Sequence, residues 1–251
     1  MKFFTAGDVL EHAKIAPTEP LTISRDESVY DALTHMLRND FDQLPVMRDD
    51  EVVGAVTFKS IARLAKSVPD SNLEKMSVMG ALVSPTYVSV EHDMFGLFET
   101  FAVEEFVLVG SSDNLGGIIT RYDVFHFLKE QFRPFIMIGE IERSLRTLFE
   151  REFPDIEEHI QETFAPRAEE DPSYSVPESL DYFNFEEYKR FIATNFEDLP
   201  EELRTDQEFV LKLLEGVRKN RNSLFHFRAG VDEIDREIIE VAHGYFTGLV
   251  E

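Results

Sequence analysis

Residues 53–57, Val-Gly-Ala-Val-Thr, recur as Gly-Gly-Ile-Ile-Thr at residues 116–120, 63 positions further along the chain. The apolar residues that precede the two stretches also correspond, since Leu44 aligns with Val107 at the same spacing. A correspondence of this length indicates that one supersecondary unit is used twice.

Both copies predict the same order of elements: a short strand, an amphipathic helix, two strands separated by turn residues, and a second helix. In the first copy the predicted helix carries an apolar stripe formed by Val29, Leu33, Met36 and Leu37. A unit of about 50 residues cannot cover its own apolar sheet face, so we expect the two copies to pack face to face and to form two related clefts.

These patterns place the first copy at about residues 16–68 and the second at residues 83–131, with a linker at residues 69–82. At the mouth of each expected cleft the third strand turns into the second helix. Helix N-terminal amides lack partners at such a turn, which makes it a natural position for a phosphate.

The second copy carries the stretch Gly-Ile-Ile-Thr-Arg-Tyr-Asp at residues 117–123. With this stretch, the repeat resembles a tandem CBS-domain pair, or Bateman module, over residues 1–132. The resemblance implies that Asp123 holds the ribose hydroxyls of an adenosine nucleotide and that Thr120 holds a phosphate. It also implies that strand residues frame the adenine, and the candidates are Thr86, Tyr87, Val88, Val107 and Leu108.

The expected regulatory ligand is AMP, ADP or ATP, with S-adenosylmethionine as a further adenosine compound. The first copy departs from the pattern because Ser60 stands where the ribose-binding aspartate is expected, so its site is expected to be weak or empty. Lys59 either reaches the phosphate of a ligand in the neighbouring cleft or is simply solvated. An alternative role for Thr120 and Asp123 is to cap the following helix, which is compatible with ligand binding.

Helical periodicity replaces strand patterns over residues 133–251, where we predict a bundle of four to five helices. Pro134 is placed to open the first helix, and residues 165–179 are predicted to form an acidic loop. The predicted apolar stripes are Ile138, Ile141, Leu145, Leu148 and Phe149; Tyr188, Phe191 and Ile192; Phe209, Leu213, Leu214 and Val217; and Ile234, Ile238, Val241 and Tyr245.

The most basic segment of the chain, residues 218–228, contains Arg221, Asn222 and His226. This spacing near the end of a helical bundle resembles the HEPN superfamily, whose members commonly dimerise and include metal-independent endoribonucleases. The resemblance implies that His226 transfers the proton of a ribose 2′-hydroxyl, that Arg221 stabilises the phosphate, and that Asn222 orients the pair. The alternative is a role in helix capping and surface ion pairs.

The formal net charge of −24 excludes a broad electrostatic grip on nucleic acid, so contact with RNA would be local and no DNA partner is expected. Cysteine is absent and the histidines show no zinc spacing, so no metal is expected. Without a span of about 20 apolar residues or a signal peptide, we expect no membrane association and a cytoplasmic location.

The sequence therefore predicts an α+β protein in which an adenosine-nucleotide-sensing CBS module controls a HEPN-like helical domain that forms a homodimer and binds or cleaves RNA. The alternative is a non-enzymatic regulator whose helical domain mediates dimerisation or binds a partner protein.

Overall fold

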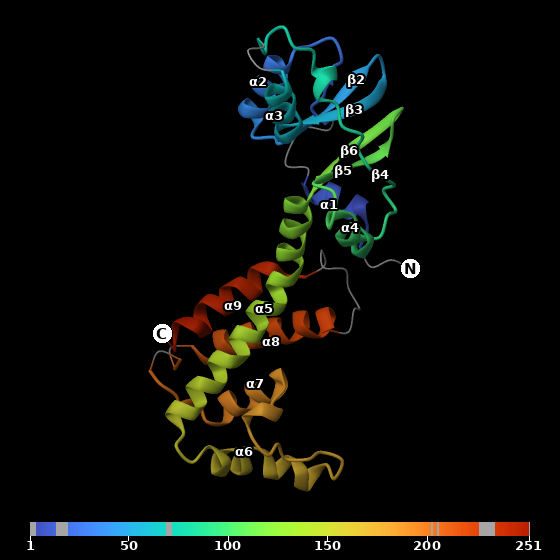
Figure 1. The fold of residues 1–251 in the computed structure, drawn as a ribbon. Helices are drawn as coiled ribbons and strands as arrows, with labels where there is room; N and C mark the ends of the chain where they lie inside the picture. The colour runs from blue at the N-terminus through green and yellow to red at the C-terminus, as the bar shows by residue number, and fades with distance from the viewer. Residues whose placement is uncertain are drawn as a thin grey trace. The chain divides into compact units, whose positions relative to one another are not determined.

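The computed structural model describes residues 4–13, 20–68, 72–201, 203–204, 206–225 and 234–250. The fold is α+β, as predicted, and the chain divides into two compact units, Met1–Leu128 and Lys129–Glu251. Both sheets lie in the first unit (Figure 1).

The first unit contains two three-stranded sheets with the same topology. In each sheet a short first strand pairs in parallel with the second strand, which pairs antiparallel with the third. The repeat seen in the sequence is therefore a repeat of strand order and register. The strands are β1 (Ile23–Ser24), β2 (Gln43–Arg48) and β3 (Glu51–Thr57), then β4 (Tyr87–Val88), β5 (Phe106–Ser111) and β6 (Asn114–Thr120).

Helices of the first unit pack on these sheets. Helix α2 starts at a capping box in which Ser28 and Asp31 bond to each other's backbone amides. Its predicted stripe is wrong at Leu37, which is 74% exposed. Ala32 is buried instead. The helical segments are α1 (Ala6–Ala13), α2 (Val29–Asn39), α3 (Phe58–Ser67), the 3₁₀ turn η1 (Val78–Ala81) and α4 (Met94–Phe101).

The segment before each repeat packs on the sheet of the other repeat. Helix α1 precedes β1 but shares a core with β4, β5 and β6, and Figure 1 shows it beside these strands. The turn η1 precedes β4 but packs into the core of β1, β2 and β3. A third cluster, which includes Val52, Ala55, Phe106 and Leu108, joins the two sheets.

Two strand glycines make room for this crossed packing. A Cβ atom on Gly117 of β6 would lie 2.4 Å from Leu10 of α1, and one on Gly54 of β3 would lie 2.5 Å from Leu82, which follows η1. Atoms cannot approach so closely, so each glycine is needed where a leucine crosses its strand.

We expect Gly117→Ala to lower the free energy of unfolding by about 1–3 kcal/mol, because an added methyl group overpacks this contact. Chemical denaturation followed by circular dichroism measures the loss. In a Leu10→Ala background the same substitution should cost less, since the crossing side chain is then shorter. Equal costs in the two backgrounds would show that Leu10 does not confine Gly117.

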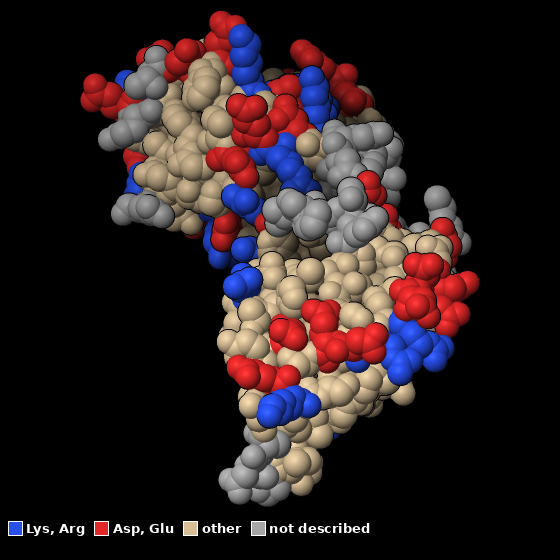
Figure 2. Space-filling view, turned by 90° about the horizontal axis from the view of Figure 1, so that it is seen from above, with Lys and Arg blue, Asp and Glu red and all other residues tan. Residues whose placement is uncertain are grey.

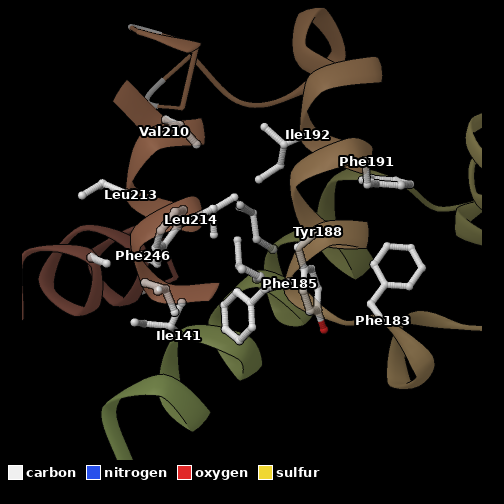
Figure 3. Packing of buried hydrophobic residues seen from close by; sticks show 14 of the residues in the cluster. Ile141, Phe183, Phe185, Tyr188, Phe191, Ile192, Val210, Leu213, Leu214 and Phe246 are labelled. Carbon is white, nitrogen blue, oxygen red and sulfur yellow. The ribbon is translucent and has the colours of Figure 1, made fainter. Parts of the chain in front are cut away.

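In the described part of the second unit, helices pack around one core that is rich in aromatic side chains. In Figure 3, Phe183, Tyr188 and Phe191 lie on one side of this core, and Leu214 and Phe246 lie on the other. Tyr188 is fully buried, yet its hydroxyl group accepts a hydrogen bond from Nε of Arg146 at 3.0 Å. The helical segments are α5 (Arg121–Glu152), α6 (Ile156–Glu170), η2 (Leu180–Tyr182), α7 (Phe185–Thr194), η3 (Phe196–Asp198), α8 (Gln207–Phe225) and α9 (Arg236–Gly248).

Three predictions for the helical half are wrong in detail. Pro134 does not open a helix, because α5 continues through it from residue 121 to residue 152. The acidic loop does not start at residue 165, because α6 contains Pro166 and ends at Glu170. Each proline removes one helical hydrogen bond, but burial of residues such as Ile138 and Phe164 outweighs that loss.

The third error concerns two predicted apolar stripes, because Phe209 of α8 is 41% exposed and Val241 of α9 is 47% exposed. The buried residues of α9 are Ile239, Ala242 and Phe246, so its core-facing side is rotated from the predicted stripe.

An ion-pair network links α7 to α8. Arg218 and Lys189 bond to Glu215 and lower the pKa of that carboxyl group to about 2, so the network stabilises the folded bundle above about pH 4.5 and weakens as the pH falls toward 2.

Candidate functional site

The turn from β6 to α5 places Thr120 and Asp123 in direct contact. The backbone N–H and the hydroxyl group of Thr120 donate to Oδ2 of Asp123 at 2.7 and 2.6 Å, and the N–H of Asp123 lies 3.3 Å from the hydroxyl oxygen of Thr120. The capping role is therefore present. It engages only one carboxylate oxygen, since Oδ1 accepts no hydrogen bond from the residues that the structure describes.

The first repeat has the same turn with different chemistry. The N–H of Thr57 donates to the hydroxyl oxygen of Ser60 at 2.9 Å, and the N–H of Ser60 donates back to the hydroxyl oxygen of Thr57 at 3.0 Å. The Ser60 hydroxyl group also donates to the Thr57 carbonyl oxygen. Both residues are buried, so this turn offers neither a carboxylate nor an open acceptor.

Four of the five predicted framing residues lie on the paired strands β4 and β5, and Thr86 directly precedes β4. The side chains of Val88, Val107 and Leu108 are buried in apolar clusters, so in this structure only their backbone can meet a ligand. Thr86 and Tyr87 are half-buried, and burial raises the pKa of Tyr87. The hydroxyl group of Thr86 donates to Glu104 at 3.1 Å.

Basic side chains from the starts of α3 and α5 surround Glu105. Nζ of Lys59 lies 2.7 Å from Oε1 of Glu105, and this hydrogen bond, followed by the charges of Lys59, Arg121 and Arg63, lowers the pKa of that carboxyl group. Arg121 also donates to the carbonyl oxygen of Glu104 at 2.9 Å. The sequence pointed to Lys59 but not to the arginines, because residues 104 and 105 belong to a loop without a recognisable motif.

This basic cluster is local. Figure 2 shows blue basic and red acidic side chains mixed on one face, without a continuous blue surface among the described residues in view. That distribution agrees with the composition of the chain, in which 49 acidic residues outnumber 25 basic residues.

In the helical unit, Arg221 and Asn222 lie in the last two turns of α8, where Nη1 of Arg221 is 3.4 Å from Oδ1 of Asn222. The neighbouring Asn220 links two helices, because it donates to the Gly216 carbonyl oxygen and accepts from the N–H of Asp235. His226 lies outside the described residues. The structure thus brings together two of the three predicted catalytic residues.

The described part of the chain was found to offer neither a cluster of metal ligands nor a membrane-spanning helix. It contains no group of three histidine, aspartate or glutamate side chains placed to hold a metal ion. None of its helices is long and apolar enough to cross a membrane.

The family profile of the CBS domain matches residues 7–67, which cover the first repeat and α1. Inosine-5′-monophosphate dehydrogenase from Thermoplasma acidophilum is 29% identical over 103 residues, which make up 41% of this chain and 20% of that enzyme. The chain thus spans about a fifth of the length of this relative.

Solved CBS-domain structures resemble about half of the chain. A CBS-domain protein from Agrobacterium tumefaciens is 20% identical, with a TM-score of 0.43, over 49% of this chain and 96% of that one. CBSX2, solved in complex with AMP, is 18% identical, with a TM-score of 0.43, over 51% of this chain and 97% of that one. From the profile match, we conclude that the chain contains a CBS domain.

Proposed function

We propose that the chain is a regulatory protein that binds one adenosine nucleotide at the second repeat. The observation that carries this proposal is the carboxylate of Asp123, which is held by Thr120 through Oδ2 while Oδ1 remains open. A carboxylate oxygen in this state accepts hydrogen bonds from the hydroxyl groups of a ribose. The CBS domain in residues 7–67 supports the proposal, because domains of this family sense nucleotides.

The phosphate of the ligand binds near the first turn of α5. Backbone amides at a helix start and the guanidinium group of Arg121 favour an anion there. Lys59 is already paired with Glu105 at 2.7 Å, so Arg121 is the basic side chain that meets the phosphate. AMP, ADP and ATP carry such a phosphate. S-adenosylmethionine does not, so it would use the ribose contact alone.

We expect Asp123→Asn to weaken nucleotide binding at least tenfold, or about 1.4 kcal/mol, because the amide lacks the charge that strengthens the ribose contacts. Isothermal titration of the full chain with AMP, ADP, ATP and S-adenosylmethionine measures the change. Asp31→Asn is the matched control, since Asp31 caps α2 through the same pair of contacts with Ser28. Equal losses in both variants would show that Asp123 only caps α5. The absence of binding by the unaltered chain would refute the nucleotide proposal.

We further propose that the helical unit is a HEPN-like domain that forms a homodimer and binds or cleaves RNA. The adjacent Arg221 and Asn222 at the end of α8 favour this reading. In the proposed reaction His226 accepts the proton of a ribose 2′-hydroxyl group, which attacks the neighbouring phosphorus. Arg221 stabilises the charge on the phosphate oxygens. The P–O5′ bond breaks and the leaving oxygen takes up the proton held by His226, which gives a 2′,3′-cyclic phosphate and a 5′-hydroxyl end. The competing proposal is a non-enzymatic bundle that binds a partner protein.

Regulation would pass along α5. Asp123 lies in the first turn of this helix, and Ile138 and Ile141 from the same helix lie in the core of the bundle. A bound nucleotide alters the activity of the bundle only as far as its affinity differs between the two states of the protein.

We expect RNA cleavage in the presence of a chelator, and we expect His226→Ala and Arg221→Gln each to reduce its rate at least a hundredfold, because each removes a reacting group. Gel analysis of end-labelled RNA measures the rate. Lys212→Gln is the control for the loss of a positive charge on α8, since Lys212 pairs with Glu208 on the exposed side of that helix. If RNA remains intact, or if His226→Ala cleaves as fast as the unaltered chain, the bundle is not a ribonuclease of this kind.

A further inference from the structure

A pocket of about 280 Å³ lies in the helical unit between α5 and α9. Its walls are formed by Glu140, Arg143, Ser144, His243, Thr247 and Val250. Five of these six residues have a polar or charged side chain, and Glu140 and Arg143 are exposed, so the pocket opens to solvent.

Ser144 is the first sign that the pocket receives a ligand. The residue is 7% exposed, and its hydroxyl group makes no hydrogen bond to the residues that the structure describes. It is not one of the fully enclosed polar atoms that lack a partner, so solvent or a ligand can reach it. Because Ser144 lines the pocket, a ligand can supply the missing partner.

Arg143 is the second sign. It makes no ion pair with any residue that the structure describes, although acidic residues outnumber basic ones by nearly two to one. Other arginines on α5 are paired: Arg133 lies 3.0 Å from Glu240, and Arg146 contacts both Glu142 and Asp181. The guanidinium group of Arg143 therefore stays available at the pocket, where its planar fork fits a phosphate or a carboxylate.

The opposite wall is set by a hydrogen bond between Nε2 of His243 and Oε2 of Glu140, at 2.6 Å. The carbonyl oxygen of His243 accepts from the hydroxyl group of Thr247 at 2.7 Å, one turn along α9. Glu140 keeps further acceptor capacity, because a carboxylate has about four lone-pair sites. The pocket thus combines a cation and a hydroxyl group with a carboxylate that can accept from ligand hydroxyl groups.

We propose that this pocket binds a small sugar phosphate. The phosphate lies against Arg143 and the hydroxyl group of Ser144, and the sugar hydroxyl groups donate to Glu140. The volume of about 280 Å³ lies just below the range of about 300–1,000 Å³ that is typical of small-molecule sites, which suits a single phosphorylated sugar better than a larger ligand. The helical unit would then carry a metabolite site of its own, separate from the nucleotide site proposed at Asp123.

Isothermal titration of the full chain with ribose 5-phosphate, inorganic phosphate and ribose tests the proposal. The titrations use the Asp123→Asn variant, so that the nucleotide site contributes less to the heat. Ribose 5-phosphate should bind at least tenfold more tightly than inorganic phosphate or ribose. Arg143→Gln should weaken it at least tenfold and Ser144→Ala severalfold, because each variant loses a phosphate contact.

Arg133→Gln is the control, since it removes an arginine from the same helix outside the pocket. Equal binding by the Arg143→Gln and Arg133→Gln variants would overturn the proposal, and so would the absence of heat with ribose 5-phosphate. Equal affinity for ribose 5-phosphate and inorganic phosphate would overturn the role of Glu140. None of these outcomes depends on whether a nucleotide binds at Asp123.

Discussion

The hydrogen bonds between Thr120 and Asp123 join the last strand of the second sheet to the first turn of α5. They hold the carboxylate at the strand end, and they leave one of its oxygens open. In the first repeat the same turn is closed by Thr57 and Ser60, whose hydroxyl groups bond only to each other's backbone. The serine at position 60, where the second repeat has Asp123, therefore makes the two repeats alike in fold and unlike in chemistry.

The glycine of the ligand motif has a packing role as well. Gly117 lies three residues before Thr120, and the side chain of Leu10 from α1 crosses β6 at that point. Gly54 admits Leu82 in the same way in the first sheet. The motif thus serves two purposes, because its glycine admits a segment from outside the repeat and its polar residues shape the turn.

Sequence patterns predicted the repeat, the strand order and most of the buried residues of the bundle, because burial imposes a period on each element. They did not predict α1, since no local pattern shows that residues 6–13 pack on a sheet more than 70 residues further along the chain. Continuation of α5 through Pro134 was also missed, because the local cost of proline is visible in the sequence but the burial that outweighs it is not. At the site, Thr120 and Asp123 followed from their motif, whereas Arg121 and Glu105 were not identified because loop packing brings them together.

The central claim is that the two turns differ in their capacity to bind a ligand. Hydrogen–deuterium exchange of the full chain, read by mass spectrometry with and without ATP, measures this difference directly. ATP should slow exchange in peptides that cover residues 120–124 and leave those that cover residues 57–61 unchanged, since only the first group contains the open carboxylate. Protection of both turns, of neither, or of residues 57–61 alone would contradict the account.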